Sequence, residues 1–280
     1  MNSEMQRQIA WITGASSGLG RELALLMAQE GWNVAISARR TEELAAVAAE
    51  ARSYLGRILP VPLDTTDAAS VKAGVERIEK EFGPIDLAVF NAGTHHPMLA
   101  EEITAEAAGA LIDVNLKGTA NCLAAVLPFF LERKAGHLAF VASMSSYRGL
   151  PTAALYGATK AGIVNMAEAL QPDLKRSGIK VQVVNPGFVK TPLTDKNDFP
   201  MPFLMEADEA ARAFYKGLQS RKFEIMFPKT FGRIMKVLRL LPASLALKLT
   251  ARAIPKEKPG AGKSAATTKN KSAQETRLTA

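Results

Sequence analysis

The sequence predicts an α/β fold, a doubly wound parallel sheet with helices on both faces. Short apolar runs alternate with longer helix-like stretches from residue 9 onward, which is the pattern of repeated strand–helix units. The run at 85–90 is apolar enough to be buried on both faces, as a strand between two helical layers would be. A glycine-rich segment joins the first run to the first helix, as in nucleotide-binding folds of this class.

Each predicted element follows from its own apolar pattern. The predicted strands are 9–13, 33–37, 58–63, 85–90, 137–142 and 180–184. The predicted helices are 21–30, 42–55, 68–81, 107–134 and 156–177. Ligands of such sheets bind beyond the carboxyl ends of the strands, so the residues that follow each strand are the candidate site residues.

The chain divides into three parts by composition. Residues 1–229 form the predicted catalytic domain, and a substrate lid is expected at about 191–215. Residues 230–254 form a basic amphipathic helical extension, interrupted by Pro242. Residues 255–280 are poor in bulky apolar side chains, which predicts a disordered tail.

Composition indicates a soluble, cytoplasmic protein. Of the 280 residues, 48% are hydrophobic and 22% charged. The single cysteine, Cys122, excludes an internal disulfide, suits a reducing compartment and lies in an apolar run typical of a buried thiol. The polar first eight residues have no signal-peptide core, and no apolar run reaches the length of a membrane span.

The net charge of +8 is concentrated near the C-terminus. From Arg221 onward there are 14 Lys and Arg against 3 Asp and Glu, whereas the preceding residues carry 21 and 24. The high isoelectric point therefore belongs to the extension and tail, and it does not indicate a nucleic-acid-binding core.

The glycine-rich turn after the first strand predicts a phosphate-binding loop. Its glycines have the spacing Gly-x3-Gly-x-Gly, which lets the backbone approach a pyrophosphate at a helix N-terminus. The alternative is a plain strand-to-helix turn, but the flanking strand and helix favour a nucleotide. The predicted cofactor-binding residues here are Gly14, Ser16, Ser17, Gly18, Leu19 and Gly20.

The end of the second strand favours NADP over NAD. An acidic residue near this point would hold the ribose 2′-hydroxyl of NAD, and Ala38 cannot do so. Arg39 and Arg40 offer guanidinium groups suited to the 2′-phosphate of NADP. The alternative is two solvated arginines at the start of a helix.

A tyrosine and a lysine four residues apart are the strongest catalytic signal. Tyr156 and Lys160 share a helix face, and Ser143 lies 13 residues before the tyrosine. A phenol is a poor acid–base catalyst at neutral pH, and an adjacent ammonium is expected to lower its pKa. Taken alone, the spacing favours an ordinary surface contact between the two side chains.

Taken together, these motifs resemble the short-chain dehydrogenase/reductase family, from Ile9 to about Gly217. Five elements occur in the family's order: the glycine loop, Asn91-Ala92-Gly93, Asn115, Ser143 with Tyr156 and Lys160, and Asn185-Pro186-Gly187. The resemblance implies a single Rossmann-type domain with about seven strands. It also implies homodimers or homotetramers.

The resemblance implies a role for each site residue. Tyr156 would be the general acid in carbonyl reduction, Ser143 would bind the substrate oxygen, and Lys160 would lower the tyrosine pKa and hold the nicotinamide ribose. Asn115 would bind a water linking Lys160 to solvent. Further cofactor contacts would come from Asp64, Thr65, Asn91, Ala92, Gly93, Pro186, Gly187, Val189 and Thr191.

This assignment predicts an NADP(H)-dependent oxidoreductase for a carbonyl/alcohol pair that needs no metal. The alternatives are epimerase or dehydratase chemistry on the same fold, and a non-catalytic NADP-binding sensor or membrane scaffold. The histidines offer no ligand set: His95 and His96 are adjacent polar loop residues, and His137 begins a strand. The serine motif departs from the family pattern, since Ser145 and Ser146 follow rather than precede Ser143.

Two apolar segments bear on the substrate and on membranes. The segment 199–205 is rich in Phe, Pro and Met, which suits an apolar or lipid-like carbonyl or else a lid packed on its own core. The segment 231–252 combines an apolar helical face with basic residues. It is expected either to contact an anionic membrane at its periphery or to dock on the enzyme's core or a second subunit.

Overall fold

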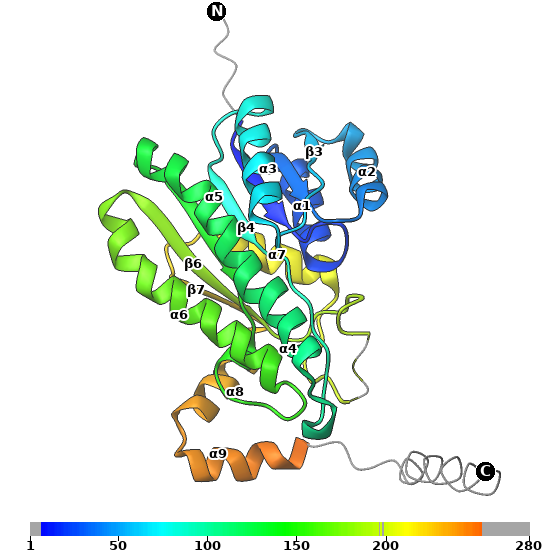
Figure 1. The fold of residues 1–280 in the computed structure, drawn as a ribbon, viewed down its shortest axis with the longest axis vertical. Helices are drawn as coiled ribbons and strands as arrows, with labels where there is room; N and C mark the ends of the chain where they lie inside the picture. Colours follow the sequence, from blue (N-terminus) through cyan, green and yellow to red (C-terminus); the bar gives the residue numbers. More distant parts are fainter. Residues whose placement is uncertain (1–6, 196, 198, 254–280) are drawn as a thin grey trace, which may run out of the picture.

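The computed structural model describes residues 7–195, 197 and 199–253. Its seven strands form one parallel sheet in the order β3-β2-β1-β4-β5-β6-β7 (Figure 1). The order reverses between β1 and β4, so a crevice opens beyond their carboxyl ends. The strands are β1 (Ile9–Thr13), β2 (Asn33–Ser37), β3 (Ile58–Pro60), β4 (Leu87–Phe90), β5 (Gly136–Val141), β6 (Ile179–Pro186) and β7 (Glu224–Phe227).

Helices cover both faces of the sheet (Figure 1). One face carries α1 (Gly18–Gln29), α2 (Thr41–Glu50) and α7 (Ala207–Leu218), and the other carries α3 (Ala68–Glu81), α5 (Gly118–Arg133) and α6 (Ala154–Arg176). The predicted doubly wound fold is confirmed. Shorter elements are α4 (Ala105–Ile112) and the turns η1 (Ala51–Ser53), η2 (Ala100–Glu102), η3 (Asp113–Lys117), η4 (Met144–Ser146) and η5 (Ala251–Ala253).

The sheet separates two apolar cores. Leu23, Ile36 and Phe214 are fully buried on the α1 face, and Trp11 and Phe130 are fully buried on the α5 face. Every residue of β1 and β4 is buried, because strands between two helical layers have no solvent-facing side. Burial of each such side chain stabilises the folded state by roughly 2 kcal/mol. The strands are therefore held firmly, and so are the residues at their carboxyl ends.

Several predicted boundaries shift in the structure. The predicted helix 107–134 is divided: α4 and α5 are joined by η3, which is one turn of π-helix. Helix α7 occupies the second half of the segment predicted as a lid, and it packs against α1 away from the site. Strand β7 was absent from the element-by-element prediction, because Glu224–Phe227 is a four-residue edge strand too short to show a period.

The continuous helical stretch Ala105–Arg133 is the one described segment with the length and apolar composition of a membrane span. Its Cys122, Val126 and Phe130 are nevertheless buried against the sheet, as in the core helix of a globular domain. Burial raises the pKa of the Cys122 thiol to about 12, which agrees with the predicted structural role of this cysteine.

Two further helices, α8 (Lys229–Leu240) and α9 (Ala243–Thr250), follow the last strand within the predicted extension. Pro242 separates them, as the sequence predicts. Met235 of α8 packs with Met144 and Tyr147 in a small third core next to the carboxyl ends of β5 and β6. The extension is therefore attached to the edge of the sheet where the strands have their carboxyl ends. The predicted tail 255–280 lies outside the described residues.

Candidate active site

The glycine loop between β1 and α1 has the backbone that phosphate binding requires. Gly14 and Gly18 have φ angles of 67° and 57°, a region that side chains disfavour. A Cβ on Gly20 would lie 2.5 Å from Asn91 Nδ2, so no side chain fits there. Helix α1 begins at this loop without a side-chain cap, which leaves its first N–H groups available to an anion.

Asn91 and Thr13 join the loop to the end of β4. Asn91 Nδ2 donates to the carbonyl oxygens of Thr13 and Gly14 at 3.0 and 3.1 Å. Thr13 Oγ1 accepts hydrogen bonds from the backbone N–H groups of Asn91 and Ala92, both at 3.0 Å. Asn91 and Ala92 thus hold the loop in place.

Arg40 lies at the glycine loop. Its Nη2 donates to Ser16 Oγ at 2.9 Å and to Ser17 Oγ at 3.1 Å, and its Nη1 is 3.3 Å from Glu43 Oε1. Arg39 is exposed and acts on Asp64 only through its charge. Of the two predicted arginines, Arg40 is the one that the structure brings to the loop.

Asp64 and Thr65 are engaged in local structure after β3. Asp64 Oδ1 accepts from Thr66 N and Thr66 Oγ1, both at 2.9 Å. The backbone hydrogen bond from Thr66 is the main cause that lowers the pKa of Asp64, and the charge of Arg39 adds to it. The carbonyl oxygen of Thr65 accepts from Asn121 Nδ2 at 2.9 Å. Their predicted adenosine contacts stay predictions.

Tyr156 and Ser143 meet at the carboxyl end of β5. Ser143 follows the strand, Tyr156 lies in the first turn of α6, and their side chains are hydrogen-bonded. Burial raises the pKa of Tyr156, and the hydrogen bond with Ser143 only partly opposes this. This direction is opposite to the lowered pKa that the i, i+4 lysine predicts.

Lys160 is buried one turn further along α6, with 4% of its surface exposed. Its Nζ donates to the carbonyl oxygen of Val141 at 2.9 Å and lies 5.8 Å from the centre of the Tyr156 ring. Burial lowers the pKa of Lys160 to about 8. The ammonium is itself destabilised by burial, which explains why it does not offset the burial of the tyrosine.

Asn115 lies in the π-turn η3 and is completely buried. Its Nδ2 donates to Thr94 O at 3.0 Å and to Thr159 Oγ1 at 3.1 Å, and its Oδ1 accepts from Thr94 N at 2.7 Å. The π-turn thus directs Asn115 between α6 and the segment after β4. A Cβ on Gly93 would lie 3.2 Å from Asn115 Oδ1 and 3.3 Å from Lys160 Nζ, so the glycine leaves room beside both groups.

Two adjoining cavities converge on Ser143 and Tyr156. The first, about 190 Å³, lies at the glycine loop, and the second, about 350 Å³, lies under α8 and α9. Thirteen predicted residues line the first cavity: Gly14, Ser17, Gly18, Leu19, Asn91, Gly93, Ser143, Tyr156, Lys160, Pro186, Gly187, Val189 and Thr191. The remaining predicted residues do not line it: Ser16, Gly20, Arg39, Arg40, Asp64, Thr65, Ala92 and Asn115.

A family model described as short chain dehydrogenase matches residues 8–200, which include the glycine loop, Asn115, Ser143, Tyr156 and Lys160. The chain is a short-chain dehydrogenase/reductase. Its α7, β7, α8 and α9 lie beyond the matched residues.

Relatives and solved structures agree with this assignment. An oxidoreductase of Myxococcus xanthus is 40% identical over 87% of this chain and 96% of its own length. A 3-oxoacyl-(acyl-carrier-protein) reductase of Thermotoga maritima is 35% identical over 69% of this chain and 78% of its own. The actinorhodin polyketide ketoreductase with NADPH has a TM-score of 0.74 at 26% identity, covering 81% of this chain and 97% of that one. A Sphingobium yanoikuyae short-chain dehydrogenase in complex with NADPH scores 0.72 at 27% identity, covering 85% and 97%.

Sequence reasoning missed one residue at the centre of this short-chain dehydrogenase/reductase site. His95 is not a polar surface residue, as predicted, but is 8% exposed, and its ring centre lies 4.3 Å from that of Tyr156. It also lines the larger cavity. Its position two residues after Asn91-Ala92-Gly93, at the end of a central strand, was the signal that could have identified it.

Sequence reasoning left open whether the extension docks on the enzyme's core and assigned it no part in the site. In the structure, α8 and α9 form a wall of the larger cavity. Phe231, Met235 and Leu238 of α8 and Leu249 of α9 line it. Phe231 stacks on Phe188 at 5.7 Å and lies nearly parallel to Phe203 at 5.8 Å. These contacts connect the extension to the segment after β6 and to the segment predicted as a lid.

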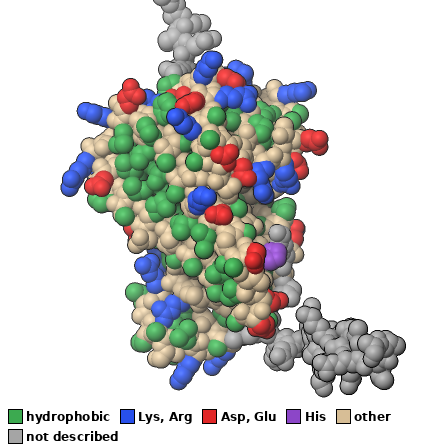
Figure 2. Space-filling view, viewed as in Figure 1, with side chains coloured by type: hydrophobic (Ala, Val, Ile, Leu, Met, Phe, Trp, Pro, Cys, Tyr) green, Lys and Arg blue, Asp and Glu red, His purple; other side chains and the backbone are tan. Residues whose placement is uncertain are grey.

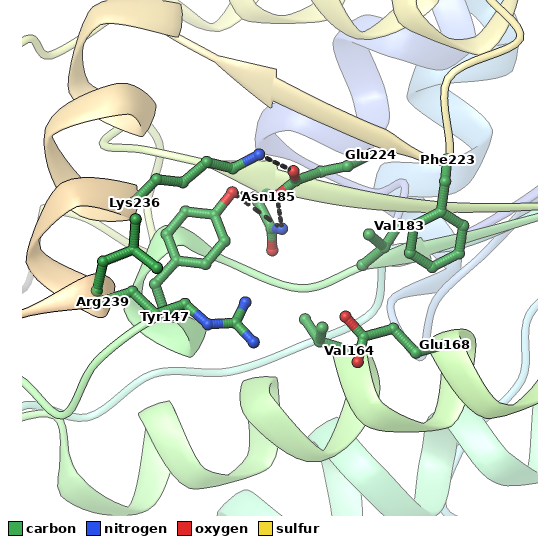
Figure 3. A pocket seen from close by; sticks show the side chains of 10 residues that line it. Tyr147, Val164, Glu168, Val183, Asn185, Phe223, Glu224, Lys236 and Arg239 are labelled. Atoms are coloured by element: carbon green, nitrogen blue, oxygen red, sulfur yellow. Dashed lines mark hydrogen bonds and ion pairs between the residues drawn. The ribbon is translucent and has the colours of Figure 1, made fainter.

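A polar cluster fixes α8 to the sheet beside a separate hollow (Figure 3). Glu224 at the start of β7 accepts hydrogen bonds from Asn185 Nδ2 at 2.8 Å, from the Tyr147 hydroxyl and from Lys236 of α8. Tyr147 follows the turn that begins at Ser143. The cluster therefore ties the extension to the loop that carries Ser143.

Glu224→Gln is expected to lower stability by roughly 1–3 kcal/mol at neutral pH. Burial raises the pKa of Glu224, but hydrogen bonds from Lys236, Tyr147 and Asn185 together outweigh burial and leave its pKa below the ordinary 4.5. A lowered folded-state pKa contributes stability that is complete above pH 4.5 and is lost as the pH falls through the folded-state value.

Thermal unfolding of wild type and Glu224→Gln across acid to neutral pH measures this effect. The difference between the two proteins should be full above pH 4.5 and shrink below it. Glu30→Gln, which removes an exposed carboxylate outside the cluster, is the control for the change in net charge. A wild type–variant difference that stays constant with pH would show that Glu224 contributes nothing as a charged group.

Proposed function

We propose that this chain is an NADPH-dependent carbonyl reductase that acts on an apolar ketone or aldehyde. The observation that carries the proposal is the position of Ser143 and Tyr156, which line both the cavity at the glycine loop and the apolar cavity beside it. A carbonyl oxygen held by these two hydroxyl groups would sit where a cofactor and a substrate meet.

The residues present fit a nicotinamide dinucleotide. The glycine loop and the uncapped start of α1 would hold the pyrophosphate, and Lys160 with Pro186 and Gly187 would line the nicotinamide end. When bound, the nicotinamide supplies the hydride.

Proton delivery in the proposed reduction belongs to Tyr156. Its raised pKa keeps the phenol protonated at neutral pH, which suits an acid. Ser143 would donate to the substrate oxygen while Tyr156 gives its proton to the alkoxide, a much stronger base than a phenolate. His95 packs on the Tyr156 ring and would limit its movement.

The proposed preference for NADPH rests on Arg40. Its guanidinium group reaches Ser16 and Ser17 of the glycine loop, and such a group binds a phosphate monoester well. The NADPH in the actinorhodin ketoreductase and the Sphingobium dehydrogenase supports this preference.

The proposed substrate class rests on the larger cavity. Phe188, Phe199, Phe231, Met235 and Leu238 give it aromatic and flexible apolar walls. Its volume of about 350 Å³ suits the body of a medium-sized apolar molecule.

Oxidation of NADPH and NADH across ketones and aldehydes of increasing apolar size tests this function. We expect wild type to prefer NADPH and kcat/KM to rise with apolar size. Arg40→Asp should lower the NADPH preference about 10–100-fold, because it replaces the phosphate partner with a like charge. Arg52→Asp, at an exposed arginine in η1, is the matched control. Turnover confined to small polar carbonyls, or an unchanged preference in Arg40→Asp, would contradict the proposal.

A further inference from the structure

Helices α8 and α9 expose an unusual amount of apolar surface. Of the thirteen large hydrophobic residues exposed in the described part of the chain, six lie between residues 234 and 249. Leu240 is 84% exposed and Val237 60%. We define the α8–α9 face as the exposed residues Ile234, Val237, Leu240, Leu245 and Leu247. A cluster of this kind marks an interaction site.

The same helices are uniformly basic. Residues 229–253 contain six Lys and Arg and neither Asp nor Glu. Lys236 is paired with Glu224. The other five basic residues are exposed: Lys229, Arg233, Arg239, Lys248 and Arg252. Figure 2 shows hydrophobic and basic side chains mixed at the end of the molecule that α8 and α9 form in Figure 1.

The opposite side of these helices lines the apolar cavity that contains Tyr156. Phe231, Met235 and Leu238 lie inside it. Leu249 lines the cavity and is also 40% exposed, so the apolar surface continues from the outside of the extension to the cavity. Phe203, which is 47% exposed and stacks on Phe231, extends the same surface onto the lid.

We propose that the α8–α9 face binds the surface of an anionic lipid bilayer and that the apolar cavity takes its substrate from that bilayer. Apolar side chains would enter the acyl boundary while the basic groups around them contact anionic headgroups. The second part of the proposal rests on the proposed reductase function, whereas bilayer binding is independent of it.

Charge favours a bilayer as the occupant of this face over a second copy of the chain and over the chain's own residues beyond 253. A second copy packed across a two-fold axis would bring the same basic groups face to face. The chain beyond residue 253 carries six Lys and Arg against two Glu, so it has the same sign as the face and would be repelled by it. An anionic membrane surface complements both features.

The test measures sedimentation of the full chain with vesicles of phosphatidylglycerol and phosphatidylcholine in equal parts, and with phosphatidylcholine alone. Wild type should bind the anionic vesicles in a salt-sensitive manner. The triple variant Ile234→Ser, Val237→Ser and Leu240→Ser keeps every charge, and its partition coefficient should fall about tenfold or more. Leu55→Ser, which changes an exposed leucine outside the extension, is the matched control and should bind as wild type does.

Three results would overturn the proposal that the α8–α9 face binds a bilayer. Failure of wild type to bind, or equal binding by the triple variant, would overturn the proposal, since the basic charges alone would then account for any binding. A change of oligomeric state in the triple variant by light scattering, without a change in vesicle binding, would assign the face to a second copy and also overturn it.

Turnover separates this proposal from the reductase function. The three substituted residues lie outside the substrate cavity. The triple variant should therefore reduce a water-soluble ketone at the wild-type rate, while its rate on an apolar ketone supplied in anionic vesicles falls about tenfold. If the triple variant matched wild type both on the water-soluble ketone and on the ketone supplied in vesicles, delivery of the substrate from the bilayer would be overturned. Absence of turnover with any ketone would reject the proposed function and leave the vesicle-binding result standing.

Discussion

Replacing Tyr156 with phenylalanine is expected to lower kcat/KM for carbonyl reduction by about 10²–10⁴-fold, the usual contribution of a general acid. The variant removes only the hydroxyl that hydrogen-bonds with Ser143, and it keeps the rest of a side chain that lines both cavities. Phenylalanine preserves the ring that packs against His95, so the fold and the cavity shape should persist.

Steady-state kinetics combined with a binding measurement identifies the affected step. NADPH affinity should change little, whereas kcat should fall, because the lost proton donor acts in the transition state. Tyr54→Phe, a partly buried tyrosine outside the cavities, is the control for removing a phenolic hydroxyl. A Tyr156→Phe variant with near-normal kcat would show that another group supplies the proton.

Replacing Lys160 with methionine is expected to abolish most activity without destabilising the cofactor-free protein at pH 7. Burial lowers the pKa of Lys160 from the ordinary 10.5 to about 8, so the folded protein holds this ammonium at a cost of up to about 3 kcal/mol. Methionine removes that cost but leaves the Val141 carbonyl oxygen without its partner, which costs about 1–3 kcal/mol. The two effects nearly offset each other.

The pH dependence of unfolding distinguishes this explanation from a simple loss of packing. Between pH 8 and 10.5 the unfolded chain binds a proton at Lys160 that the folded protein does not, so the contribution of Lys160 to wild-type stability rises with pH in this window. Lys160→Met lacks this gain and should be the less stable protein at pH 10.5. Lys80→Met, at an exposed lysine, controls for the general effect of alkaline pH. A large loss of stability in Lys160→Met already at pH 7 would contradict the prediction.

Local sequence patterns predict the central sheet well. Strand β2 and helix α3 have the predicted bounds. Polar residues bound the apolar run of β2, and Asp67 caps the start of α3. Gly14 and Gly18 have the positive φ angles that a phosphate-binding turn requires. The proposed catalytic residues could be picked out from the sequence because spacing along one helix and distance from a strand end are local properties.

Long-range packing accounts for what the sequence did not reveal. The π-turn that directs Asn115 inward interrupts a helix whose apolar pattern is continuous. Burial of Tyr156, rather than its lysine neighbour, decides the direction of its pKa shift, and burial depends on the whole fold. The position of Phe231 over the cavity depends on contacts with Phe188 and Phe203 that no local period encodes.

The proposed catalytic groups and one wall of the substrate cavity come from different parts of the chain, and this separation has an evolutionary consequence. The groups proposed to transfer the proton lie within residues 8–200, whereas Phe231, Met235, Leu238 and Leu249 lie in a separate terminal segment. Mutations in that segment can change which molecules fit while leaving proton transfer intact, so substrate range and chemistry can diverge independently. Exchanging the terminal segment between relatives offers a direct route to redesigning selectivity.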